Sequence, residues 1–173
     1  QPDPAKDQPC MAPKPSLQVC LRCGGLAFRG LAALRGGRSR KAPTPDALAI
    51  HSLVAMSQVA VADGRIDDAE VRQISAILTR LTGRGYSMEQ VAELLARLNP
   101  SAADLAQVGQ DLSAKDRQII LEAALNIAVA DGEIHPSEYA VVSDLAQRMQ
   151  IGADEFRHAM ARISQHLGAS QPA

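Results

Sequence analysis

The sequence has few aromatic residues and no long apolar run, and both shortages narrow the fold class. Only 2% of the 173 residues are aromatic and tryptophan is absent. The core must therefore be aliphatic, which suits closely packed helices better than a β-sandwich or barrel. The best candidate for a membrane span, residues 47–62, is interrupted by His51, Ser52, Ser57 and Gln58. It falls short of the roughly 18 apolar residues that a membrane span needs.

Cysteine is scarce and confined to one region, at Cys10, Cys20 and Cys23. The rest of the chain has no disulfide, which fits a reducing compartment, and we expect a cytoplasmic location. Cys20-x-x-Cys23 could be half of a zinc site, but zinc takes four ligands and there is no second pair. A redox pair is the other functional interpretation, although the surrounding glycines offer no thioredoxin-like context. We favour an incidental pair.

Charge divides the chain into a basic tail and an acidic remainder. Residues 1–45 carry eight Lys/Arg and two Asp, whereas residues 46–173 carry ten Lys/Arg and 17 Asp/Glu. An acidic folded part argues against nucleic-acid binding by the fold itself, because phosphate binding needs a basic face. The tail could contact nucleic acid or an anionic membrane, which would place the protein at the inner face of the membrane.

Composition also sets the predicted domain boundaries. We expect a disordered tail rich in Pro, Gly and Arg over residues 1–45, a helical domain over 46–168 and a disordered C-terminus over 169–173. Residues 17–41 resemble a targeting presequence or a membrane-surface segment in composition. An unfolded basic leader is the interpretation that we favour.

From residue 46 onward, apolar residues recur at helical spacing, and no stretch alternates long enough to predict a strand. The pattern predicts an all-α bundle of about seven helices. The helices predicted at 46–62 and from Ser113 to about residue 130 are apolar nearly all round, so we expect them to be central and buried. Capping boxes mark helix starts at Asp67-x-x-Glu70 and Ser87-x-x-Gln90.

One segment occurs twice. Shifted by 68 residues, Ala60-Val-Ala-Asp-Gly-Arg-Ile-Asp-Asp-Ala-Glu70 lies over Ala128-Val-Ala-Asp-Gly-Glu-Ile-His-Pro-Ser-Glu138, and eight of the 16 positions in 55–70 are identical. The match predicts duplication of a helix–turn–helix unit. Each unit would comprise a buried helix, an Asp-Gly turn, an inward Ile66 or Ile134, and an amphipathic helix.

The aspartates of these turns need a partner, because a helix C-terminus disfavours a negative charge by about 0.3–1 kcal/mol. The interpretation that we favour is local: each carboxylate accepts hydrogen bonds from nearby backbone amides. The alternative is a divalent cation, which takes several oxygen ligands, although the loops are too short for an EF-hand. The candidate metal ligands are Asp63, Asp67 and Glu70 in the first turn, or Asp131, Glu133 and Glu138 in the second.

The doubled A-D-G-x-I-x-x-x-E motif resembles the TerB family, which includes the tellurite-resistance protein TerB and the related N-terminal domain of DjlA-type co-chaperones. The resemblance covers roughly residues 46–167. It implies a helical bundle, a candidate metal-binding acidic cluster, and a part in bacterial stress or membrane-associated complexes, without a known reaction. The cluster would comprise Asp63, Glu70, Asp131 and Glu138. His135 stands where the first copy has Asp67, and no J-domain follows.

Function is predicted mainly by what the sequence does not contain. No nucleophile elbow, zinc-protease motif, P-loop or dinucleotide fingerprint is present, so we assign no catalytic or cofactor-binding residue. The predicted domain has no thiol with which to reduce tellurite. We expect a non-enzymatic binding module for a protein partner, and a divalent cation at the acidic turns stays open as an addition to it. The alternatives are a metal-dependent enzyme that uses the paired carboxylates, and a membrane-surface accessory protein that acts through its tail.

Overall fold

The computed structural model describes residues 18–19, 26–27 and 45–169. In this part of the chain the helical prediction is confirmed, because residues 45–169 form seven helices. The helices are α1 (Pro45–Ala60), α2 (Asp68–Thr82), α3 (Met88–Arg97), α4 (Ala102–Gln107), α5 (Ala114–Ala128), α6 (Pro136–Arg148) and α7 (Ala153–Ala169).

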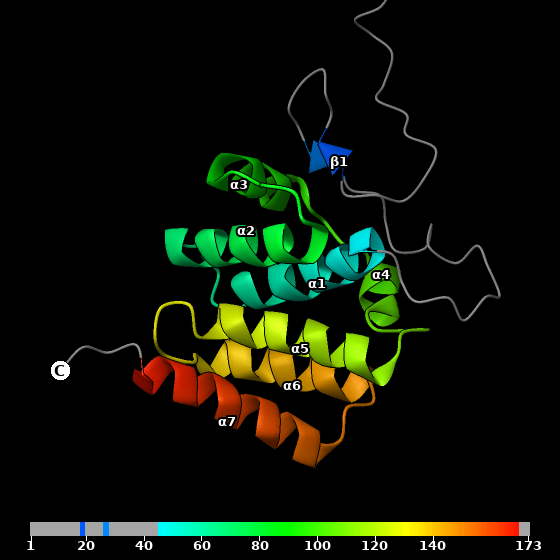
Figure 1. Ribbon diagram of the computed structural model, residues 1–173, viewed down its shortest axis with the longest axis vertical. Helices are drawn as coiled ribbons and strands as arrows, with labels where there is room; N and C mark the ends of the chain where they lie inside the picture. The colour runs from blue at the N-terminus through cyan, green and yellow to red at the C-terminus, as the bar shows by residue number, and fades with distance from the viewer. Residues whose placement is uncertain (1–17, 20–25, 28–44, 170–173) are drawn as a thin grey trace, which may run out of the picture.

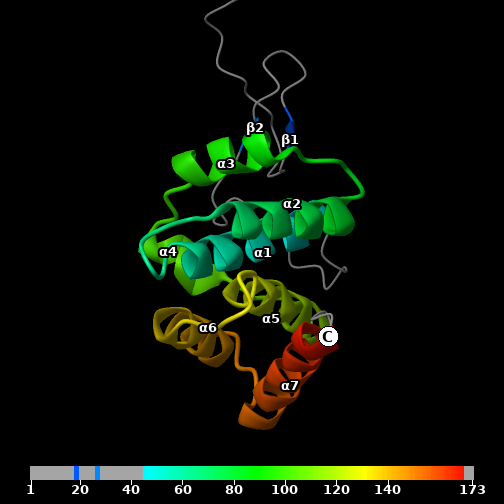
Figure 2. The ribbon, with the colours of Figure 1, turned by 90° about the vertical axis from the view of Figure 1, so that its left-hand side faces the viewer.

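Two helical hairpins, α1–α2 and α5–α6, form the centre of the domain (Figures 1 and 2). The most extensive contact between elements joins α1 to α5, and α1 also packs on α2 and α6. The remaining helices lie outside these layers: α3 on α2, α7 on α5, and the short α4 at one end of α1 (Figure 1). Sequence-distant helices therefore meet at the core.

The two helices predicted to be central are the buried ones. Five consecutive apolar or small positions of α1 between Leu53 and Ser57 are at most 5% exposed, and Ile50 is fully buried. In α5, Ile120 and Leu121 are fully buried as well. Alanines on both helices are also buried, which allows close approach, and each buried Ile or Leu contributes about 2 kcal/mol.

Local sequence signals set the helix ends as predicted. Asp67 and Ser87 each accept a hydrogen bond from the third helical residue, and Glu70 and Gln90 return one, so both capping boxes form. Gly83 closes α2 in the left-handed conformation, with φ of 70°. Capping therefore agrees with the pattern read from the sequence.

Outside the helical domain, two described strands pair in antiparallel fashion, β1 (Gln18–Val19) with β2 (Leu26–Ala27). The sequence predicts no regular element there. The other predictions for the tail, including those for its cysteines and for membrane contact, concern residues outside those that the structure describes. None of the helices in the described residues is long and apolar enough to cross a membrane.

Candidate functional site

The two Asp-Gly turns lie at the same end of the molecule. They connect α1 to α2 and α5 to α6, and both connections appear at the left of Figure 1. Gly64 and Gly132 adopt φ values of 88° and 99°, a region that glycine enters without the steric cost of a Cβ atom. Each glycine thereby reverses the chain after a buried helix, as predicted.

The turn aspartates accept hydrogen bonds from backbone amides two residues further on. The amide N–H of Arg65 donates to Asp63 Oδ1 at 2.9 Å, and that of Glu133 donates to Asp131 Oδ1 at 3.1 Å. The local interpretation of these aspartates is therefore confirmed for one oxygen of each. Both residues are exposed, and these two bonds use only Oδ1 of each.

Behind each aspartate lies a buried glutamate that caps the next helix. Glu70 Oε2 accepts the N–H of Asp67 at 2.8 Å, and Glu138 Oε2 accepts that of His135 at 2.8 Å. Glu70 is 7% exposed and Glu138 is 9% exposed. Within the described part of the chain, neither Oε1 atom has a recorded hydrogen-bond partner.

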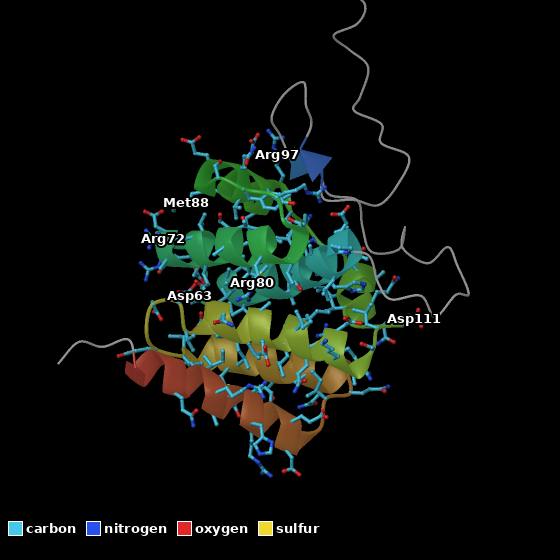
Figure 3. The ribbon with its side chains drawn as sticks, viewed as in Figure 1. Asp63, Arg72, Arg80, Met88, Arg97 and Asp111 are labelled. Carbon is cyan, nitrogen blue, oxygen red and sulfur yellow. The ribbon has the colours of Figure 1, made fainter. Side chains whose placement is uncertain are left out.

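Carboxylates from both turns line one cleft of about 350 Å³. Figure 3 shows Asp63 at the edge where the two hairpins meet. Five of the six predicted metal ligands line this cleft, whereas Glu133 does not. The full lining comprises Asp63, Arg65, Ile66, Asp67, Glu70, Ile127, Asp131 and Glu138.

Burial and mutual repulsion raise the pKa of both glutamates. The pKa of Glu70 rises to about 7, mainly because burial disfavours the charged form; the negative charges of Asp67, Asp63 and Glu138 add to the rise. The capping hydrogen bond from Asp67 N–H acts in the opposite direction. Glu70 is therefore partly protonated near neutral pH.

The pKa of Glu138 is also raised, first by burial and then by the charges of Asp131 and Asp63. The His135 amide and the charge of its imidazole oppose this rise. Asp63 belongs to the other turn, so its effect on Glu138 shows that the two turns share one electrostatic field. Sequence spacing alone does not reveal this coupling.

The carboxylates are close enough to interact but are not arranged as metal ligands. Among the described residues, no group of three or more carboxylate, imidazole or thiol side chains could hold a metal ion as it stands. A cation held by both turns would require rotation of the exposed Asp63 and Asp131 side chains. Glu70 and Glu138 are fixed in place by their capping bonds.

Two features of the site differ from the sequence prediction or were missed by it. Ile66 was predicted to point inward, but it lines the cleft and is 38% exposed, so that prediction is wrong. Ile134 is half-buried and packs against the core. Arg65 and Ile127 were not predicted as lining residues. The only feature of the sequence that could have indicated a place for Arg65 in the cleft is its position directly after the turn glycine.

Comparison with protein-family models gives a match to the family described as tellurite resistance protein TerB, over residues 49–161. A comparison with curated proteins and with solved structures gives no significant match. The family match covers both hairpins, both Asp-Gly turns and the cleft between them, together with the first half of α7. The chain therefore belongs to the TerB family.

Proposed function

We propose that this TerB-family domain is a non-enzymatic binding and scaffold module whose site is the acidic cleft between the two turns. In this proposal the cleft takes one divalent cation shared by both turns, and the protein acts in a bacterial stress response of the tellurite-resistance type. The observation that carries the proposal is the convergence of carboxylates from Asp63, Glu70, Asp131 and Glu138 on one cleft.

The chemistry of the donors favours a hard cation such as Ca²⁺, Mg²⁺ or Mn²⁺. These ions prefer several oxygen ligands, and the Oε1 atoms of Glu70 and Glu138 have no recorded partner in the described residues. A bound cation would relieve the repulsion that raises the pKa of both glutamates. Asp63 and Asp131 are exposed and can rotate toward it.

Two observations support a binding role over catalysis. Apart from the carboxylates, which can themselves act as acids or bases, the described residues that line the cleft include no serine, threonine, cysteine, histidine or lysine to act as a side-chain nucleophile. Ile66, which lines the cleft, is 38% exposed, and Val61, two residues before Asp63, is 49% exposed. Apolar surface next to a charged site suits a protein partner, which we propose docks at this end of the domain.

The test is a thermal melt of the full, metal-stripped chain with and without Ca²⁺, Mg²⁺, Mn²⁺ or Zn²⁺. A cation that binds only the folded state raises stability by about 4 kcal/mol at a concentration a thousand times its Kd. We expect a rise in melting temperature with the cation. The double variant Asp63→Asn with Asp131→Asn should abolish this rise, because it removes two carboxylate charges. The turns should stay intact, since asparagine can still accept the turn hydrogen bond.

The matched control is Glu133→Gln, which removes a predicted ligand that does not line the cleft. It should leave the cation shift unchanged. Replacement of the three tail cysteines with serine separates zinc binding by thiols from zinc binding by the cleft. No shift with any ion, or an equal shift in the double variant, would refute the cation site and leave a protein-binding module.

A further inference from the structure

The segment between α3 and α5 is shallowly embedded in the domain. Its helix α4 has only six residues, none of them buried. A helix this short is not stable alone, so its position depends on tertiary contacts. The chain after α4 uses two left-handed residues, Gly109 with φ of 75° and Asp111 with φ of 59°. Val108 and Gly109 are the buried residues of the segment, and Leu98, Leu105 and Leu112 pack against the core while partly exposed.

A histidine of α1 holds this segment. His51 is 6% exposed, and its Nδ1 accepts the backbone N–H of Gly109 at 3.3 Å. Glycine is required there, because a Cβ atom would lie 2.6 Å from Cγ of Met149. Asp111, two residues later, lies at the opposite end of the molecule from Asp63 (Figure 3), so this contact is separate from the acidic cleft.

The hydrogen bond exists only while His51 is neutral. An imidazole accepts through a nitrogen that carries no proton, and protonation turns both ring nitrogens into donors. The charged Nδ1–H would then face the N–H of Gly109. Burial, with no contribution from a charged neighbour, lowers the pKa of His51 to about 4.

The charged residues of this region have other roles. On α5, Arg117 lies beside Gly109 and donates to the carbonyl of Met149 at 2.9 Å. The carboxylate of Asp104 on α4 accepts hydrogen bonds from the N–H and hydroxyl of Ser101 at the start of that helix, and Asp111 is exposed. No described ion pair involves His51. Protonation would therefore place an uncompensated charge inside the fold.

We propose that His51 and Gly109 form an acid-sensitive latch, in which protonation of His51 releases residues 98–113 while the bundle of α1, α2, α5 and α6 stays folded. Release is local because the segment fully buries one large apolar side chain, Val108, and packs Leu98, Leu105 and Leu112 only partly against the core, whereas the bundle buries most of the other large apolar side chains. The open state uncovers Val108 and Met149 as an apolar surface that is closed at neutral pH.

The direction of the pH dependence follows from proton linkage. In the open state His51 is solvated and titrates near 6.5, whereas in the closed state its pKa is about 4. The open state binds more protons between these values, so the latch has its full strength above pH 6.5 and weakens as pH falls. The opening equilibrium rises about tenfold per pH unit in this window.

The experiment is amide hydrogen exchange on the full chain between pH 7 and 4.5, with rates corrected for the intrinsic pH dependence. We expect the opening constants of Val108 and Gly109 to rise about tenfold per pH unit below 6.5, while core amides of α1 and α5 keep theirs. In His51→Gln, whose side-chain oxygen accepts a hydrogen bond without titrating, this rise should disappear. The same rise in His51→Gln, or a rise shared by all amides, would overturn the proposal.

A second measurement does not depend on the variant folding. An NMR titration of the unmodified chain follows the imidazole of His51, with the exposed His135 and His158 as internal references. We expect His51 to titrate below both references and together with the amide of Gly109. Titration of His51 alongside them, with Gly109 unchanged, would rule out the latch.

Discussion

The two Asp-Gly turns have the same hydrogen-bond pattern but different charges. In each, a left-handed glycine follows the aspartate, the aspartate accepts an amide two residues on, and a buried glutamate caps the next helix. The first turn has Asp67 at the helix start and the second has His135.

The change of capping residue leaves the backbone geometry of the turn intact, but it changes the electrostatic effect on the neighbouring glutamate. His135 Nδ1 still receives the N–H of Ser137, although at 3.5 Å, and the glutamate bond persists. The charge of Asp67 raises the pKa of Glu70, whereas the charge of His135 lowers that of Glu138. The carboxylate of the first turn is therefore the one whose pKa is raised further.

The largest expected effect is from Glu70→Gln. Because the folded pKa of about 7 lies above the ordinary value of 4.5, the stability from Glu70 is present below pH 4.5 and is lost as pH rises through 7. Glutamine keeps the cap without the charge, so the variant should gain about 2 kcal/mol at pH 8 and nothing at pH 4. Denaturant unfolding at the two pH values measures this.

The same substitution in the second turn, Glu138→Gln, should gain less at pH 8, because His135 opposes the rise in the pKa of Glu138. Glu89→Gln is the control, since Glu89 also lies in a first helical turn but is exposed. Equal gains in Glu70→Gln and Glu138→Gln would contradict the asymmetry between the turns.

The next prediction concerns the left-handed glycine that both turns share. Gly64→Ala and Gly132→Ala should each cost about 1 kcal/mol, because both glycines are left-handed and a Cβ atom meets nothing within 4 Å at either position. The two costs should be equal, as judged by denaturant midpoints. Gly85→Ala, with equal space and no left-handed φ, should be neutral or slightly stabilising. Unequal costs would mean that the turns differ in more than charge.

The smallest effect is from exchanging the capping residues. Asp67→His should cost about 0.5 kcal/mol, since histidine is the weaker cap, and should lower the pKa of Glu70. His135→Asp should raise the pKa of Glu138. Carbon-detected NMR titration of the glutamate carboxyl groups reads both shifts. If neither pKa moves, burial alone sets both values.

Much of the fold was predictable because its determinants are local. The capping boxes, the glycines and the helical spacing of apolar residues each act over a few residues, and α2 and α3 begin as the sequence predicts. The exposure of Ile66 and the capping role of His135 were not predictable. The first depends on how closely the opposite hairpin approaches, and the second on a side chain that rarely caps helices.

For the candidate site, the sequence by itself determined which residues carry charge and how each turn is hydrogen-bonded, because those bonds span only two or three positions. The tertiary structure decided that α1 and α5 pack together with both turns at one end. That packing makes one cleft from two turns, leaves Glu133 outside it, and buries Glu70 and Glu138 close enough to raise their pKa values. Desolvation and repulsion between distant segments depend on three-dimensional distance, which no local pattern specifies.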